Sequence, residues 1–288
     1  MRRGIRVLAC LTLATLATAC GQANPQQAAP GTGTPGAGSP GLAHVHGLGV
    51  DPADGTLYAA SHYGLFTVPE GAKAERVGDR MQDTMGFTVV GPNHFLGSGH
   101  PDPRDAGKAP RLGLIESTDA GKSWRSLSLE GEADFHSLEA KHGSVYGYDS
   151  QTGQLAVTSD QRNWDRRGQV AMADFAVSPT SPDTLLATTE QGLARSTDGG
   201  RTFTPLTGAP LLQLVDWPSE ASVVGMAPDG GVHVSADGGA TWTRPGQVPG
   251  KPTALATNGP SEVFVSTSTA IHSSDDGGRT FTQRQALN

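Results

Sequence analysis

Six side chains that can bind a soft or borderline metal ion lie in short segments of similar pattern. The segments HVHGL, DTMGF and DFHSL each end in an apolar residue, and two positions before it stand His46, Met85 and His136. Imidazole and thioether groups together suit copper, whereas a mixed histidine and aspartate set also suits zinc. The candidate metal ligands are His44, His46, His62, Met85, His100 and His136.

Carboxylates in or near the same segments allow a different chemistry. Hydrolysis of a glycoside needs two carboxyl groups, one on each side of the scissile bond. Asp83 and Asp134 precede Met85 and His136 by two residues. The candidate catalytic residues are Asp83, Asp134, Glu190 and Asp229. Aromatic residues, which stack on sugars, make up only 6% of the chain.

A recurring sequence motif, here called the box, indicates how these segments are positioned. STDGGRTF at residues 196–203 returns as STDAGKSW (117–124), SADGGATW (235–242) and SDDGGRTF (274–281), with a shortened copy, TSDQRNW, at 158–164. The aspartates of these boxes are Asp119, Asp160, Asp198, Asp237 and Asp276, spaced by 38 to 41 residues. A regular period of this length is typical of a repeat protein.

The residues between the boxes predict strands rather than helices. Runs such as TLLATT (184–189) and EVFVSTS (262–268) are rich in β-branched residues and are bounded by Gly, Pro, Asp and Asn. No segment has a sustained apolar stripe of helical period. The sequence therefore predicts an all-β fold, a six-bladed β-propeller over residues 44–288. The predicted blades are 44–82, 83–132, 133–171, 172–210, 211–250 and 251–288.

The connectivity of such a blade sorts the candidate residues onto two faces. The start of the first strand and the end of the second share one face, here called the top, whereas the boxes lie on the opposite face. His46, Met85 and His136 then share a ring position with Ala173, Leu212 and Thr253, and His62 and His100 end second strands. Five histidines should meet in one sector of the top face. His94, His142, His233 and His272 fall outside it.

The box pattern resembles the Asp-box, or BNR, repeat of sialidases, related glycoside hydrolases and photosystem II stability-factor-like propellers. The runs HVHGL, MGF, SGHPD and DFHSL also resemble a group of bacterial Asp-box lipoproteins labelled sialidase-like or glycosyl hydrolases. The resemblance implies that the box aspartates are structural. Sialidases resemble one another in a cluster of three arginines and a Tyr/Glu pair, whereas only Arg104 and Arg111 fall on the top face here. A typical sialidase is therefore disfavoured.

The start of the chain has the layout of a secretory signal. Three arginines precede an apolar run and small residues that lead to Cys20, and LATAC resembles a lipobox. We expect a signal peptide at residues 1–19, lipidation of Cys20 and a Gly/Pro/Ala-rich linker through residue 43. The mature protein would be held on the outer face of a bacterial cell membrane, in the cell envelope. Cys10 and Cys20 are the only cysteines, so no disulfide is expected in residues 44–288.

Charge narrows the choice of partners. Cleavage before Cys20 removes three arginines and leaves 18 basic and 28 acidic residues, a net charge of −10. Nucleic acid is an unsuitable partner for such a chain, because phosphate binding needs positive charge. Three functions stay open: a monomeric module that binds copper or zinc, a non-catalytic scaffold for a protein partner or small ligand at the top face, and a glycoside hydrolase.

Overall fold

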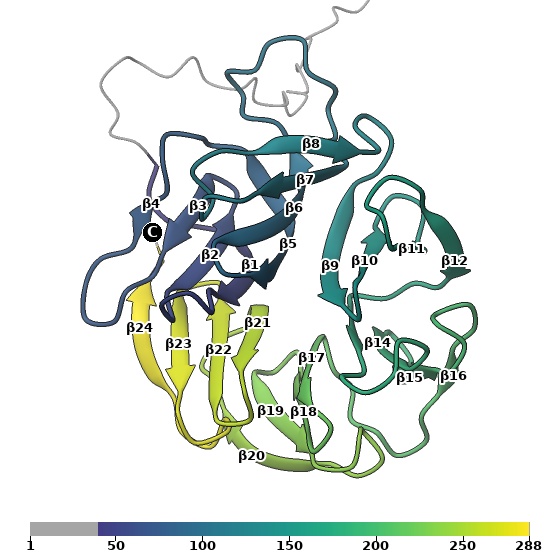
Figure 1. Cartoon of the computed structure of the whole chain (residues 1–288). Helices are drawn as coiled ribbons and strands as arrows, with labels where there is room; N and C mark the ends of the chain where they lie inside the picture. The colour runs from purple at the N-terminus through teal and green to yellow at the C-terminus, as the bar shows by residue number, and fades with distance from the viewer. Residues whose placement is uncertain (1–39, 288) are drawn as a thin grey trace, which may run out of the picture. The chain divides into compact units, whose positions relative to one another are not determined.

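The computed structural model describes residues 40–287, which form six four-stranded antiparallel sheets in chain order. The sheets are arranged around a centre as the blades of a propeller (Figure 1). The predicted all-β, six-bladed fold is confirmed. Residues 40–287 contain no helix long and apolar enough to cross a membrane. The predicted signal peptide, Cys20 and most of the linker lie outside the described residues.

Each blade contributes four consecutive strands, which pair in sequence order. Blades one to three contain β1 (Val45–Val50), β2 (Leu57–Ser61), β3 (Gly64–Thr67), β4 (Glu75–Arg76), β5 (Asp83–Gly91), β6 (His94–His100), β7 (Leu114–Ser117), β8 (Arg125–Ser128), β9 (Phe135–Lys141), β10 (Ser144–Asp149), β11 (Gln154–Thr158) and β12 (Asp165–Gln169). Blades four to six contain β13 (Asp174–Val177), β14 (Leu185–Thr189), β15 (Gly192–Ser196), β16 (Thr204–Pro205), β17 (Leu214–Ser219), β18 (Ser222–Met226), β19 (Gly231–Ser235), β20 (Thr243–Gln247), β21 (Pro252–Asn258), β22 (Glu262–Thr267), β23 (Ala270–Ser274) and β24 (Thr282–Ala286).

The first strands of all six blades line a central channel of about 500 Å³. In β1 the pairing advances two residues, from Val45 to Gly47, while β2 advances one, so His46 is an extra, bulged residue. Four first strands have a bulge of this kind near their start. The bulged residues are His46, Met85, His136 and Thr253. A bulge changes the direction of a side chain relative to the regular alternation of a strand. Here all four bulged residues line the channel.

The ring position predicted for blade five is wrong by one residue. Val215 pairs with Gly225 as Leu138 pairs with Gly147, so the residue equivalent to His136 is Gln213 rather than Leu212. The prediction took Leu214 as the apolar reference residue, whereas Val215 has that role. Leu212 is only 2% exposed and packs in the core between blades four and five.

The boxes lie between the third and fourth strands of blades two to six, as predicted. In blade four Ser196 Oγ donates to Asp198 Oδ1 at 2.7 Å and accepts from Gly200 N at 2.8 Å. The same carboxylate accepts from Thr202 N and Thr202 Oγ1. These bonds, with Thr202 the largest contributor, hold the pKa of Asp198 well below its usual range. Gly199 and Gly200 both have positive φ, which glycine adopts without strain.

Three carboxylates on first strands form hydrogen bonds that link each strand to the next blade. Glu139 Oε2 accepts from Val177 N at 2.6 Å, and Asp174 Oδ2 accepts from Val215 N at 3.0 Å. Asp216 repeats the pattern with Thr257 N at 2.9 Å. Blades three to six are thereby linked at the channel wall.

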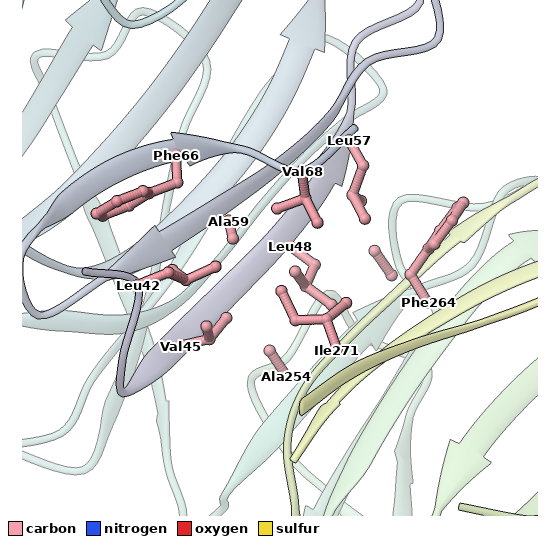
Figure 2. Close-up of a cluster of buried hydrophobic side chains, with 11 residues drawn as sticks. Leu42, Val45, Leu48, Leu57, Ala59, Phe66, Val68, Ala254, Phe264 and Ile271 are labelled. Carbon is pink, nitrogen blue, oxygen red and sulfur yellow. The ribbon is translucent and has the colours of Figure 1, made fainter. Parts of the chain in front are cut away.

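Packing between the first and last blades closes the ring (Figure 2). Leu48 and Phe66 of blade one share a buried cluster with Phe264 and Ile271 of blade six. Leu42, 4% exposed, belongs to the same cluster, so the segment just before β1 packs with the propeller. Two hydrogen bonds cross the seam, from Ala74 N to Gln285 Oε1 at 2.8 Å and from Arg284 Nε to Val68 O at 2.9 Å.

Replacing Ser196 with Ala tests the structural role of the box. The change leaves the buried Gly200 N–H without its acceptor, which should lower the free energy of unfolding by about 1 to 3 kcal/mol. Chemical denaturation measures this loss. Ser268→Ala, at an exposed position, is the matched control, and equal stability of the two variants would contradict the role.

Replacing Ile271 with Ala tests the seam. Ile271 is fully buried, so the cavity left behind should cost about 2 to 5 kcal/mol of unfolding free energy. Val90→Ala, at a residue 39% exposed, is the control and should change stability by less than about 0.5 kcal/mol. A loss as small as that of the control would show that closure does not rely on this cluster.

Candidate metal centre

Asp83, the first residue of β5, is the centre of the histidine cluster. Its Oδ2 lies 2.9 Å from His62 Nδ1 and 3.4 Å from His100 Nδ1, and its Oδ1 lies 3.4 Å from His46 Nε2. His46 is the bulged residue of β1, His62 follows β2, and His100 ends β6. Blade two therefore presents one carboxylate to imidazoles from blade one and from its own second strand.

One atom from each of His46, His62 and Asp83 lies within 4.8 Å of the corresponding atoms of the other two. Donor atoms this close together allow one metal ion to bind all three side chains. His46 Nε2 and Asp83 Oδ1 are both buried and lie 3.4 Å apart, and neither atom makes a well-formed hydrogen bond. Buried polar atoms without a partner are costly, and a bound cation would satisfy both.

Asp134 forms a second centre beside the first. Its Oδ2 lies 3.2 Å from His136 Nε2, 3.6 Å from His100 Nε2 and 3.5 Å from Gln151 Nε2. The side chain is 2% exposed, and its Oδ1 is buried without a partner. His100 lies between the two carboxylates and contacts both. The sequence reasoning missed Gln151, although it directly follows the blade-three residue equivalent to His62 and His100.

Contacts with the histidine rings lower the pKa values of both carboxyl groups. Burial raises the pKa of Asp83, but the contacts with His46, His62 and His100 outweigh it and hold the pKa below its ordinary value. Burial likewise opposes the lowering of the Asp134 pKa by His136 and His100. Both groups are therefore held as carboxylates, the form that binds metal.

Two predicted ligands lie at the edge of this arrangement. His44 is exposed, and its ring contacts His62 edge-on with centroids 6.1 Å apart. It adopts a positive φ of 50° just before β1. Met85 lines the channel with His46 and His136. Blade two places this thioether between the histidines of blades one and three.

The histidines expected outside the cluster lie elsewhere. His94 contacts Glu116 at 2.8 Å, and His142 contacts Ser178 O at 2.7 Å. His233 and His272 lie within β19 and β23, and burial lowers the pKa of each.

The four candidate catalytic carboxylates lie in different surroundings. The pKa values of Asp83 and Asp134 are lowered, whereas a general acid in a glycosidase needs a raised pKa. Asp229 binds Gly231 N and Arg244, and both lower its pKa. Glu190 follows β14 in blade four and lines an apolar groove with Leu211 and Met172.

Comparison with known proteins supports the fold. No family model matches the sequence, and no curated protein matches it. A structure of YCF48 bound to a D1 peptide matches with a TM-score of 0.53 and 18% identity, over 85% of this chain and 83% of that one. YCF48 from Cyanidioschyzon merolae matches with a TM-score of 0.55 and 11% identity, over 85% and 97%.

A glycoside hydrolase of the same architecture is also similar. The GH74 enzyme of Niastella koreensis matches with a TM-score of 0.61 and 14% identity, over 87% of this chain and 46% of that one. This chain thus spans less than half of that enzyme. At these identities the likenesses show the propeller fold alone, and membership of the Asp-box family stays a prediction.

Replacing Asp83 with Asn should lower the melting temperature of metal-free protein near pH 6 and have little effect well below pH 4. A carboxyl whose pKa is lower in the folded state stabilises the fold above its unfolded value of about 3.9 and loses this contribution as the pH falls further. Thermal unfolding with a chelator, from about pH 7 to 3, measures the difference. Asp79→Asn, at a side chain 86% exposed, is the control. A difference independent of pH would contradict this explanation.

Proposed function

We propose that the protein is a membrane-anchored, extracytoplasmic propeller that binds a divalent transition metal at the top mouth of its channel. The convergence of His46, His62 and Asp83 within 4.8 Å carries this proposal. Two buried atoms at that point, His46 Nε2 and Asp83 Oδ1, make no well-formed hydrogen bond, which supports the proposal. The anchor rests on the predicted lipidation of Cys20, which would hold the propeller on the outer face of the cell membrane.

The donor set selects the class of metal. Two imidazole nitrogens and a carboxylate oxygen suit zinc(II) and copper(II), whereas magnesium and calcium prefer oxygen ligands alone. At a shared site copper(II) binds more tightly than zinc(II) in the Irving–Williams order. Met85 supplies a soft thioether at the same mouth, which also favours binding of copper(I). Copper is therefore the preferred ion.

A scaffold for a protein partner is the second candidate function. It is supported by the structure of YCF48 with a D1 peptide, which shares the propeller fold. The apolar groove at Leu211, 53% exposed on the top face, offers a surface for such a partner. The metal proposal has the stronger support, since its donors already converge, and the lowered carboxyl pKa values disfavour the glycoside hydrolase.

Titration of the purified full-length protein with copper(II) and zinc(II) tests the proposal. The wild type should bind with saturation, and His46→Ala and Asp83→Asn should each weaken binding by more than about tenfold, because each removes a ligand. His142→Ala is the matched control, since His142 lies in the β9–β10 turn and should leave binding unchanged. If the wild type binds no more tightly than a variant lacking His44, His46, His62, His100 and His136, the scaffold function takes its place.

The pH dependence and the methionine give two further readouts. Affinity should fall as the pH drops from about 8 to 5.5, because protons then compete with the metal for the imidazole nitrogens. Met85→Leu should weaken copper(I) more than copper(II), because the thioether is the soft donor. Competition titrations with a chelator of known affinity measure both. Affinity that does not change between about pH 8 and 5.5 would exclude histidine ligation.

A further inference from the structure

We propose that the apolar groove at the top of blade four binds a small organic cation, an ammonium group on an apolar chain or ring. The groove has a volume of about 450 Å³. It is formed by the ends of second strands and the segments before first strands in blades three to five. The inference goes beyond the proposed function and does not depend on it, because the groove contains none of the six candidate metal ligands, all of which the structure describes.

Apolar side chains make up most of the lining. Met172 is buried in the core between blades three and four, and Leu212 in the core between blades four and five. Leu211, by contrast, is more than half exposed although it lines the same groove. Ligand sites for small molecules are mostly apolar clefts of about 300 to 1,000 Å³ with a few polar groups that fix orientation. The groove therefore has the size and the lining of such a site.

The threonines and the glutamine of the lining already have hydrogen-bond partners. Thr188 Oγ1 donates to Gln213 O at 3.1 Å, and Thr189 Oγ1 donates to Gly192 O at 2.7 Å. Gln213 Nε2 donates to Pro252 O at 3.0 Å. These bonds fix the three side chains to the backbone of the propeller, so the orientation of a ligand depends chiefly on another group.

Glu190 alone is charged among the described residues that line the groove. It directly follows β14 and is exposed, and within residues 40–287 its carboxylate has no hydrogen bond or ion pair. Asp229, beside the lining residue Pro228, differs because Arg244 Nη2 lies 2.9 Å from its Oδ2 and balances its charge. An uncompensated carboxylate at an apolar surface attracts a cation and repels an anion.

Charge and apolar lining together define the ligand. An ammonium ion can approach Glu190, while the chain or ring that carries it covers Leu211 and removes apolar surface from water. A primary alkylamine is protonated at neutral pH, since its pKa lies near that of lysine, about 10.4. The net charge of −7 for the whole chain also attracts cations over anions. The charged and the apolar parts of the ligand make separate contributions, which can be measured one at a time.

Titration of the full-length protein with hexylamine, hexan-1-ol and hexanoate tests the inference. Binding is followed by nuclear magnetic resonance at neutral pH and low salt, with a chelator that keeps metal from binding the amine. Hexylamine should bind with saturation, about two- to fivefold more tightly than the alcohol, because an ion pair at an exposed carboxylate contributes little. This ratio should fall towards one at about 0.5 M salt. Hexanoate should bind most weakly.

Two substitutions separate the charge from the apolar contact. Glu190→Gln should lower the affinity for hexylamine to that for hexan-1-ol and leave the alcohol unchanged. Leu211→Ser should weaken both ligands and keep their ratio, because it removes apolar surface that both cover. Asp229→Asn is the matched control and should change neither affinity. All three residues are exposed, and thermal unfolding verifies that the variants are folded.

The outcomes are distinct from those of the metal titration. Glu190→Gln should bind copper(II) as the wild type does, so failure of one proposal leaves the other standing. Equal affinities for the amine and the alcohol at low salt, or no saturable binding of hexylamine, would overturn the inference. A short peptide with one lysine that binds more than about tenfold more tightly than butylamine, through added backbone contacts, would assign the groove to a protein partner and overturn it as well.

Discussion

Closure of the ring between blades one and six is the constraint on which the candidate site depends, because blade one carries His46 and His62. Blade one is built entirely from the start of the propeller and blade six entirely from its end, so no strand is shared across the seam. Closure therefore relies on apolar packing around Leu48 and Ile271 and on two hydrogen bonds. The seam supports blade one, which carries His46 and His62, and thereby holds these imidazoles against Asp83 of blade two.

Stability and ligand chemistry are assigned to opposite faces. On the bottom face, the box residues accept the hydrogen bonds of their own turns. Along the channel wall, neighbouring blades are joined by Glu139, Asp174 and Asp216. At the top of blades two and three Asp83 and Asp134 instead face imidazoles, and each has one buried oxygen without a well-formed hydrogen bond. Proteins tolerate such local costs at functional sites, where a ligand can compensate for them.

The sequence predicted the blades because the box has a fixed spacing, and it predicted the clustering of His46, His62, His100 and His136 because equivalent strands begin on one face. It could not predict Asp83 as the shared centre, since strand alternation alone does not show which side chain a bulge turns towards a neighbouring blade. The one-residue error at Leu212 has a similar origin. Adjacent apolar residues, Leu214 and Val215, fit the pattern equally, and only pairing with Gly225 distinguishes them.

Anomalous X-ray diffraction from crystals of the metal-loaded protein shows directly whether the top mouth of the channel binds an ion. We expect an anomalous peak at coordination distance, about 2.0 to 2.2 Å for zinc, from His46 Nε2, His62 Nδ1 and an oxygen of Asp83. If a metal-loaded crystal shows anomalous peaks only at other positions, and these three side chains contact one another instead, the proposed metal site is wrong.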